Sequence, residues 1–116
     1  MDWGEVIRRL RGVCEMIGGH FISGSERPED ISTPFVGCSV PFGEIIIDRD
    51  EQLITLVYAQ DKTRYIRNEF SGIRPEEIQD IAPIDHGGEP IMFIRSDKVD
   101  ILLSKKGYTT IARYRL

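Results

Sequence analysis

The chain is poor in the residues that usually carry special chemistry. Its 116 residues contain two cysteines and two histidines. Cys14 and Cys38 lie 24 positions apart and form neither a CxxC pair nor the dense pattern of a disulfide-rich secreted domain. We therefore expect two reduced thiols that are buried as small apolar side chains.

Long apolar runs are also missing. No stretch approaches the roughly 18 apolar residues that a membrane-spanning helix needs. The first nine residues, MDWGEVIRR, are charged and lack the apolar centre of a signal peptide. These absences predict a cytoplasmic protein with no membrane partner.

Common ligand-binding motifs are absent as well. The sequence contains no GxGxxG, GxxxxGK[ST], HExxH or GxSxG pattern. The segment DRDEQL begins like a calcium loop, but Leu53 stands at its sixth position and Ala59 at its twelfth, where glycine and glutamate are required. We expect no cofactor.

What is present is typical of one globular domain, which we expect to span residues 1–116. Apolar residues make up 41% and charged residues 29% of the chain. The formal net charge is −4, yet residues 95–116 carry a net charge of +4 and the remainder carries −8. This asymmetry favours a charged partner or self-association between opposite faces.

An N-terminal helix is the clearest expected element. Apolar residues recur at steps of three and four from Trp3 to Ile17. Asp2 can cap the first turn, and the pair Gly18-Gly19 can end the helix.

The rest of the chain reads mainly as strands. Segments 20–23, 35–42, 44–47, 53–59, 91–95, 98–104 and 108–116 have strand character. Residues 64–70 are ambiguous between helix and strand, residues 75–81 predict a second short helix, and residues 82–90 predict a loop. The order predicts an α+β fold, with the N-terminal amphipathic helix packed on a mostly antiparallel sheet of about six to eight short strands.

The segment IDHGGEP is the strongest candidate for chemistry. His86 could act as a general base, with Asp85 beside it and Cys38 as a possible nucleophile. A curled loop could also bring His86 and Glu89 onto a metal ion, although no further ligand stands at a recognisable spacing. The favoured alternative is a turn made by Gly87 and Gly88, with no metal bound.

A basic C-terminal hairpin is the second candidate surface. It contains Arg113 and Arg115 on one strand face, with Lys105, Lys106 and Tyr108 at the turn. These residues could bind a partner or single-stranded nucleic acid, or could simply prevent edge-to-edge strand pairing. The acidic residues of the polar loop 24–34 form a third possible partner surface.

These observations favour a small non-enzymatic interaction or ligand-binding domain that forms a homodimer or another homo-oligomer or binds a protein partner. One alternative is a small enzyme or metal-binding protein that uses His86 with Asp85 or Glu89, and Cys38. The other is a nucleic-acid-binding protein that uses the basic hairpin. The sequence identifies no substrate, ligand or partner.

Overall fold

The computed structural model describes residues 1–27, 30–105 and 111–114. Over these residues the chain forms one α-helix, α1 (Trp3–Met16), one 3-10 helix, η1 (Pro75–Glu77), and nine strands. The strands, in chain order, are β1 (His20–Ser23), β2 (Phe35–Val40), β3 (Gly43–Asp48), β4 (Leu53–Ala59), β5 (Tyr65–Ser71), β6 (Ile78–His86), β7 (Glu89–Ser96), β8 (Val99–Leu103) and β9 (Ile111–Tyr114).

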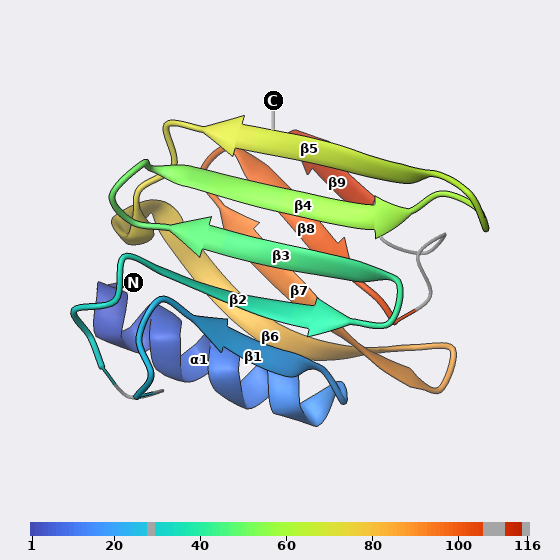
Figure 1. The fold of residues 1–116 in the computed structure, drawn as a ribbon, viewed down its shortest axis with the longest axis horizontal. Coiled ribbons are helices and arrows are strands. Elements are labelled where there is room, and N and C mark those ends of the chain that lie inside the picture. Colours follow the sequence, from blue (N-terminus) through green and yellow to red (C-terminus); the bar gives the residue numbers. More distant parts are fainter. Residues whose placement is uncertain (28–29, 106–110, 115–116) are drawn as a thin grey trace.

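The strands form two antiparallel sheets in which each strand pairs with the next one along the chain. Sheet A has the order β1-β2-β3-β4-β5, and sheet B has the order β6-β7-β8-β9. Figure 1 shows the two sheets as layers, with α1 lying along the side where β1 and β6 are the edge strands. The predicted α+β class and antiparallel pairing are confirmed, whereas the expected single sheet of about six to eight strands is wrong.

The N-terminal helix forms as its sequence pattern predicts. The Asp2 carboxylate accepts a hydrogen bond of 2.8 Å from the Glu5 amide, and Gly18 ends the helix at φ +79°. One stripe of the helix is buried against the sheets, from Val6 to Cys14. Within the described residues, no helix is both long enough and apolar enough to cross a membrane.

The predicted second helix at 75–81 is wrong beyond its first turn. Pro75–Glu77 form a single 3-10 turn, and the chain then enters β6 at Ile78. Ile81 faces the core, and Pro83 follows it within the same strand. Proline is disruptive inside a helix but is tolerated in an edge strand, where one side of the backbone has no partner strand. The pairing of β6 with β7 and the burial of Ile78 and Ile81 therefore prevail over the helix-start signal.

Two other segments are more regular than their composition indicates. Residues 65–70 of the ambiguous segment 64–70 fall in β5, where Ile66 and Phe70 are more buried than their neighbours. The expected loop 82–90 is instead the end of β6, a two-residue turn and the start of β7. Short strands with charged residues on their outward side have a residue composition that resembles that of loops. Only the alternation of buried and exposed positions identifies them as strands.

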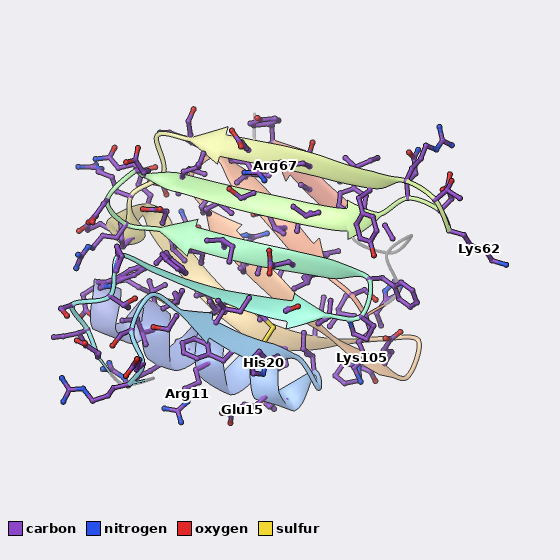
Figure 2. The ribbon with its side chains drawn as sticks, viewed as in Figure 1. Arg11, Glu15, His20, Lys62, Arg67 and Lys105 are labelled. Carbon is purple, nitrogen blue, oxygen red and sulfur yellow. A yellow bond between two sulfur atoms is a disulfide. The ribbon has the colours of Figure 1, made fainter. Side chains whose placement is uncertain are left out.

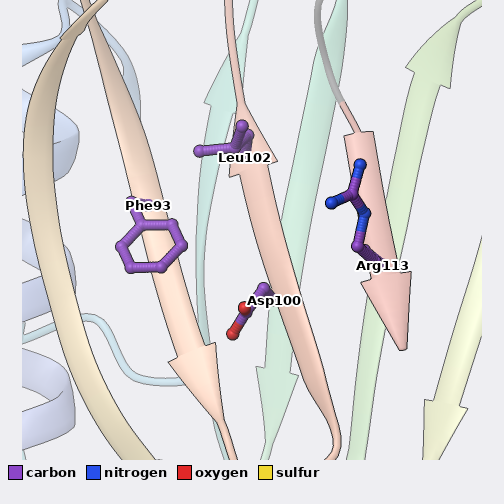
Figure 3. A pocket seen from close by; sticks show the side chains of 4 residues that line it. All are labelled: Phe93, Asp100, Leu102 and Arg113. Atoms are coloured by element: carbon purple, nitrogen blue, oxygen red, sulfur yellow. The ribbon is translucent and has the colours of Figure 1, made fainter. Parts of the chain in front are cut away.

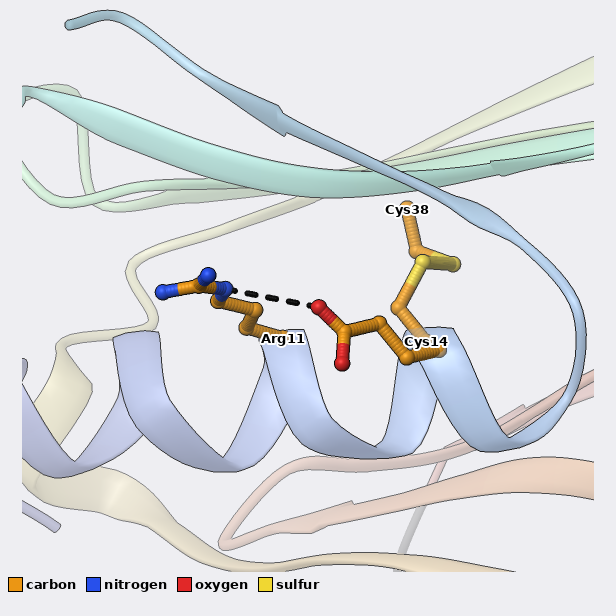
Figure 4. The surroundings of a disulfide bond; sticks show 4 residues. Arg11, Cys14 and Cys38 are labelled. Carbon is orange, nitrogen blue, oxygen red and sulfur yellow. Dashed lines mark ion pairs between the residues drawn. A yellow bond between two sulfur atoms is a disulfide. The ribbon is translucent and has the colours of Figure 1, made fainter. Parts of the chain in front are cut away.

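One cluster of buried apolar side chains joins α1 and both sheets. A disulfide between Cys14 of α1 and Cys38 of β2 lies inside it, with a Cα–Cα distance of 5.7 Å (Figure 4). This bond corrects the expectation of two reduced thiols: separation in sequence hid their contact, since α1 packs directly on β2. A Cβ atom at Gly19 would lie 2.6 Å from one sulfur and 2.9 Å from the other, so only glycine fits there.

Candidate functional site

The segment that contains His86 is a tight hairpin turn. Gly87 and Gly88 have φ angles of +61° and +84°, and His86 pairs directly with Glu89 across the turn. Two consecutive positive φ angles are the signature of a type I′ hairpin, for which glycine is favoured. The favoured interpretation of the glycines as a turn is therefore confirmed.

The turn brings two of the candidate residues together and separates the others. His86 and Glu89 lie opposite each other on one side of the hairpin, while Asp85 points to the other side, and both His86 and Asp85 are exposed. Cys38 lies on sheet A and is bonded to Cys14, so it carries no free thiol here. In the described part of the chain, no group of three or more His, Cys, Asp or Glu side chains is arranged to hold a metal ion.

Of the basic C-terminal candidates, Lys105 and Arg113 lie within the described residues. Lys106, Tyr108 and Arg115 lie outside them. A Cβ atom at Gly18 would lie 2.9 Å from Lys105 Nζ, so the ammonium group lies at the C-terminal end of α1 (Figure 2). A cation there interacts favourably with the helix dipole. Lys105 thus has a structural contact, and Arg113 lies on a different surface.

Arg113 belongs to a row of alternating charges across the outer face of sheet B. The strand register aligns Asp80 of β6 with Arg95 of β7, Arg95 with Asp100 of β8, and Asp100 with Arg113 of β9. We call these four residues the charge row. Since residues in register project to the same side of a sheet, all four lie on the face opposite the core.

The charge row is held by weak, exposed contacts. The Arg95 Nε atom lies 3.4 Å from Asp100 Oδ1, and the Arg9 guanidinium of α1 lies 3.9 Å from Asp80 Oδ1. Among the described residues, Arg113 forms no salt bridge within 4.0 Å. Its planar guanidinium can therefore bind a carboxylate with two parallel hydrogen bonds.

An apolar row lies beside the charge row. Ala82, Phe93 and Leu102 are in register on β6, β7 and β8, and all three are half-buried. We call them the apolar row. The Arg95 guanidinium lies 5.3 Å from the centre of the Phe93 ring, which is a cation–π contact that joins the two rows.

A hollow of about 230 Å³ lies between the rows (Figure 3). It is lined by Phe93 and Leu102 from the apolar row and by Asp100 and Arg113 from the charge row. A surface of this kind combines an apolar anchor region with charges of both signs. The hollow offers apolar contact, a hydrogen-bond acceptor and a guanidinium that forms no salt bridge with the residues that the structure describes.

Of the residues on this face, sequence reasoning identified Arg113, together with His86 and Glu89 at the hairpin end of the same face. Asp80 was missed because residues 75–81 read as a helix, and Phe93, Arg95, Asp100 and Leu102 read simply as strand residues. Their alternation with buried residues was the available signal, since i, i+2 positions line one face of a strand. What the sequence could not supply was the register that aligns the four strands.

The acidic loop between β1 and β2 is engaged with itself. Asp30 accepts hydrogen bonds from the Ser32 hydroxyl at 2.7 Å, the Ser32 amide at 2.9 Å and the Ser25 hydroxyl at 2.9 Å. The loop also meets α1, because the Trp3 indole donates to the Thr33 carbonyl at 3.0 Å. The Asp30 carboxylate therefore joins Ser25 and Ser32 within this loop, of which residues 28 and 29 lie outside the described residues.

The architecture defines this protein as a two-sheet antiparallel sandwich with one helix along its side. Neither a protein-family model, nor a curated protein, nor a solved structure matches the chain.

Proposed function

We propose that residues 1–116 form a single non-enzymatic interaction domain that binds protein, including other copies of itself, through the outer face of sheet B. One observation carries this proposal: an apolar row and an alternating charge row lie side by side, with a hollow between them. Protein interfaces combine aromatic and arginine anchors with polar surroundings in this manner.

The mixed charges of this face favour protein over nucleic acid. A surface that binds a phosphate backbone needs an excess of cations, because its affinity depends on neutralised phosphates. The charge row contains Asp80 and Asp100 beside Arg95 and Arg113, so it has no net charge. Carboxylates and guanidinium groups in equal number instead complement the mixed side chains of a protein surface.

The test is the molar mass of the purified chain in solution, measured by size-exclusion chromatography with light scattering over a range of concentrations. We expect the wild type to exceed the 13.3 kDa of one chain. Phe93→Asp places a carboxylate in the apolar row and is expected to return the mass to that of one chain.

Phe42→Asp is the matched control, since Phe42 is 50% exposed in the turn between β2 and β3 of the other sheet. The same substitution there should leave the assembly intact. A wild type heavier than one chain whose mass Phe93→Asp leaves unchanged would remove the outer face of sheet B as the binding surface.

A cytoplasmic location is a separate prediction, and the disulfide opposes it. Cytoplasmic reductants keep most thiols reduced, whereas oxidising compartments preserve disulfides. Titrating the thiols of protein purified from its native cells and denatured without reductant decides the matter. Two reactive thiols per chain would support the cytoplasm, and none would support an oxidising compartment.

A further inference from the structure

We infer that the partner bound by the outer face of sheet B is a second copy of this chain, related by a twofold axis that runs along the strands between β7 and β8. This inference rests on the proposed binding role of that face and names its partner.

When a second charge row is laid over the first in the opposite order, each charge faces a charge of the opposite sign. From β6 to β9 the charges alternate: Asp80 is negative, Arg95 positive, Asp100 negative and Arg113 positive. A twofold axis along the strands lays a second row over the first in the opposite order. Asp80 then faces Arg113 of the second copy, and Arg95 faces Asp100 of the second copy, so each of the four positions meets the opposite charge.

The same axis also matches the apolar row. Rotation about an axis along the strands leaves each position at the same height along the strand, so the apolar row of one copy meets the apolar row of the other. Phe93 of β7 then faces Leu102 of β8 in the second copy, and the reverse contact forms by symmetry. Such an isologous contact closes at two chains, as most homo-oligomers do. Two sheets pack face to face at about 10 Å, which is within reach of arginine and aspartate side chains.

The charged row on the outer face of sheet A lacks this property. It consists of His20, Ser39, Glu44, Val57 and Arg67, one residue from each of the five strands. Reversal of this five-strand row places Glu44 against its own copy. Like charges at the centre of an interface disfavour it. Among these two rows, only the charge row of sheet B meets opposite charges at every position.

Charge reversal at the ends of the row tests the inference. Arg113→Asp alone creates two Asp–Asp contacts across the twofold axis, and Asp80→Arg alone creates two Arg–Arg contacts. Each variant should raise the dissociation constant of the dimer at least about 100-fold. An equimolar mixture of the two variants restores Asp–Arg at both positions. We therefore expect native mass spectrometry to show a heterodimer of one chain of each.

The doubly reversed chain, with both substitutions, should recover the homodimer. Arg67→Asp is the matched control, because Arg67 is an exposed arginine on a strand of sheet A and is paired with Glu69 (Figure 2). It should leave the dimer unchanged. Thermal unfolding of each variant confirms folding, which matters most for Asp80→Arg because Asp80 contacts Arg9.

The outcomes separate this inference from the proposed function. A wild-type dimer that Phe93→Asp disrupts, but whose charge variants form no heterodimer, overturns the twofold arrangement and leaves the binding face in place. A wild type that stays at 13.3 kDa at every concentration overturns the second copy as partner. A dimer that is indifferent to Phe93→Asp overturns the proposed face itself.

Discussion

Single polar residues hold the irregular parts of this chain, and Asp30 is the clearest case. Hydrogen bonds from the Ser32 hydroxyl, the Ser32 amide and the Ser25 hydroxyl lower the pKa of Asp30 from 3.8 to about 2. The folded state therefore binds its proton less readily than the unfolded state. The stability that the ionised Asp30 carboxylate contributes is present above its pKa in the unfolded state. This stability is lost as the pH falls through its pKa in the folded state.

We predict that an NMR titration finds the pKa of Asp30 near 2, and that stability to urea declines as the pH is lowered from 4 toward 2. In Asp30→Asn this contribution to the decline should be missing, because the amide does not titrate. A carboxyl that titrates at its ordinary value would show that the three hydrogen bonds do not persist in solution.

Thr33 is a second residue on which the same loop depends. Its side chain is 2% exposed, accepts a hydrogen bond of 2.8 Å from the Gly24 amide and donates one of 2.9 Å to the Phe35 carbonyl. Valine has the same shape without the hydroxyl, so Thr33→Val removes both hydrogen bonds, while the Gly24 amide keeps its bond of 3.1 Å to the Phe35 carbonyl. We predict a loss of about 1 kcal/mol in the free energy of unfolding.

Thr33→Ser keeps the hydroxyl and provides the comparison. Urea denaturation should rank the stabilities as wild type, then serine, then valine. A valine variant at least as stable as the serine variant would mean that solvent replaces the hydroxyl at no cost.

At the scale of elements, the sequence predicts the structure correctly where its local signals agree. The prediction is wrong where pairing between strands determines the structure. The helix α1 has a cap, an apolar stripe and a terminating glycine, and all three point to the same element. At 75–81 the proline and two glutamates favour a helix, yet β6 gains more by pairing with β7 and placing Ile81 in the core. Tertiary contacts override weak local preferences in such segments.

The candidate site was less predictable than the fold for the same reason. Its residues come from four strands, and only their register places Asp80, Arg95, Asp100 and Arg113 in one row. Conversely, His86 attracted attention because reactive residue types cluster in its segment. That cluster is the natural composition of an exposed two-residue hairpin turn.

The disulfide links two elements, α1 and β2, whose buried side chains also pack in one cluster. It closes a loop with a sequence separation of 24 residues between α1 and β2. A disulfide that closes a loop of that length restricts the unfolded chain and so raises the free energy of unfolding by about 3 kcal/mol. We predict that Cys14→Ala combined with Cys38→Ala lowers the free energy of unfolding in urea by about this amount.

A reductant provides the control. It should weaken the wild type to a similar extent and leave the double variant unchanged. A wild-type urea midpoint that is insensitive to full reduction would show that helix packing alone holds α1 in place.

At the scale of the whole molecule, stability and assembly should be linked. Anything that binds the folded chain and not the unfolded chain raises its unfolding temperature with concentration, and a second copy is such a ligand. We predict that the Tm of the wild type rises when the protein concentration is raised about 100-fold, whereas the Tm of Phe93→Asp stays constant. Phe42→Asp should behave as the wild type, because Phe42 lies in the β2–β3 turn of the other sheet. A wild-type Tm that does not change with concentration would contradict a dimer coupled to folding. A parallel rise in all three proteins would place the contact elsewhere on the molecule.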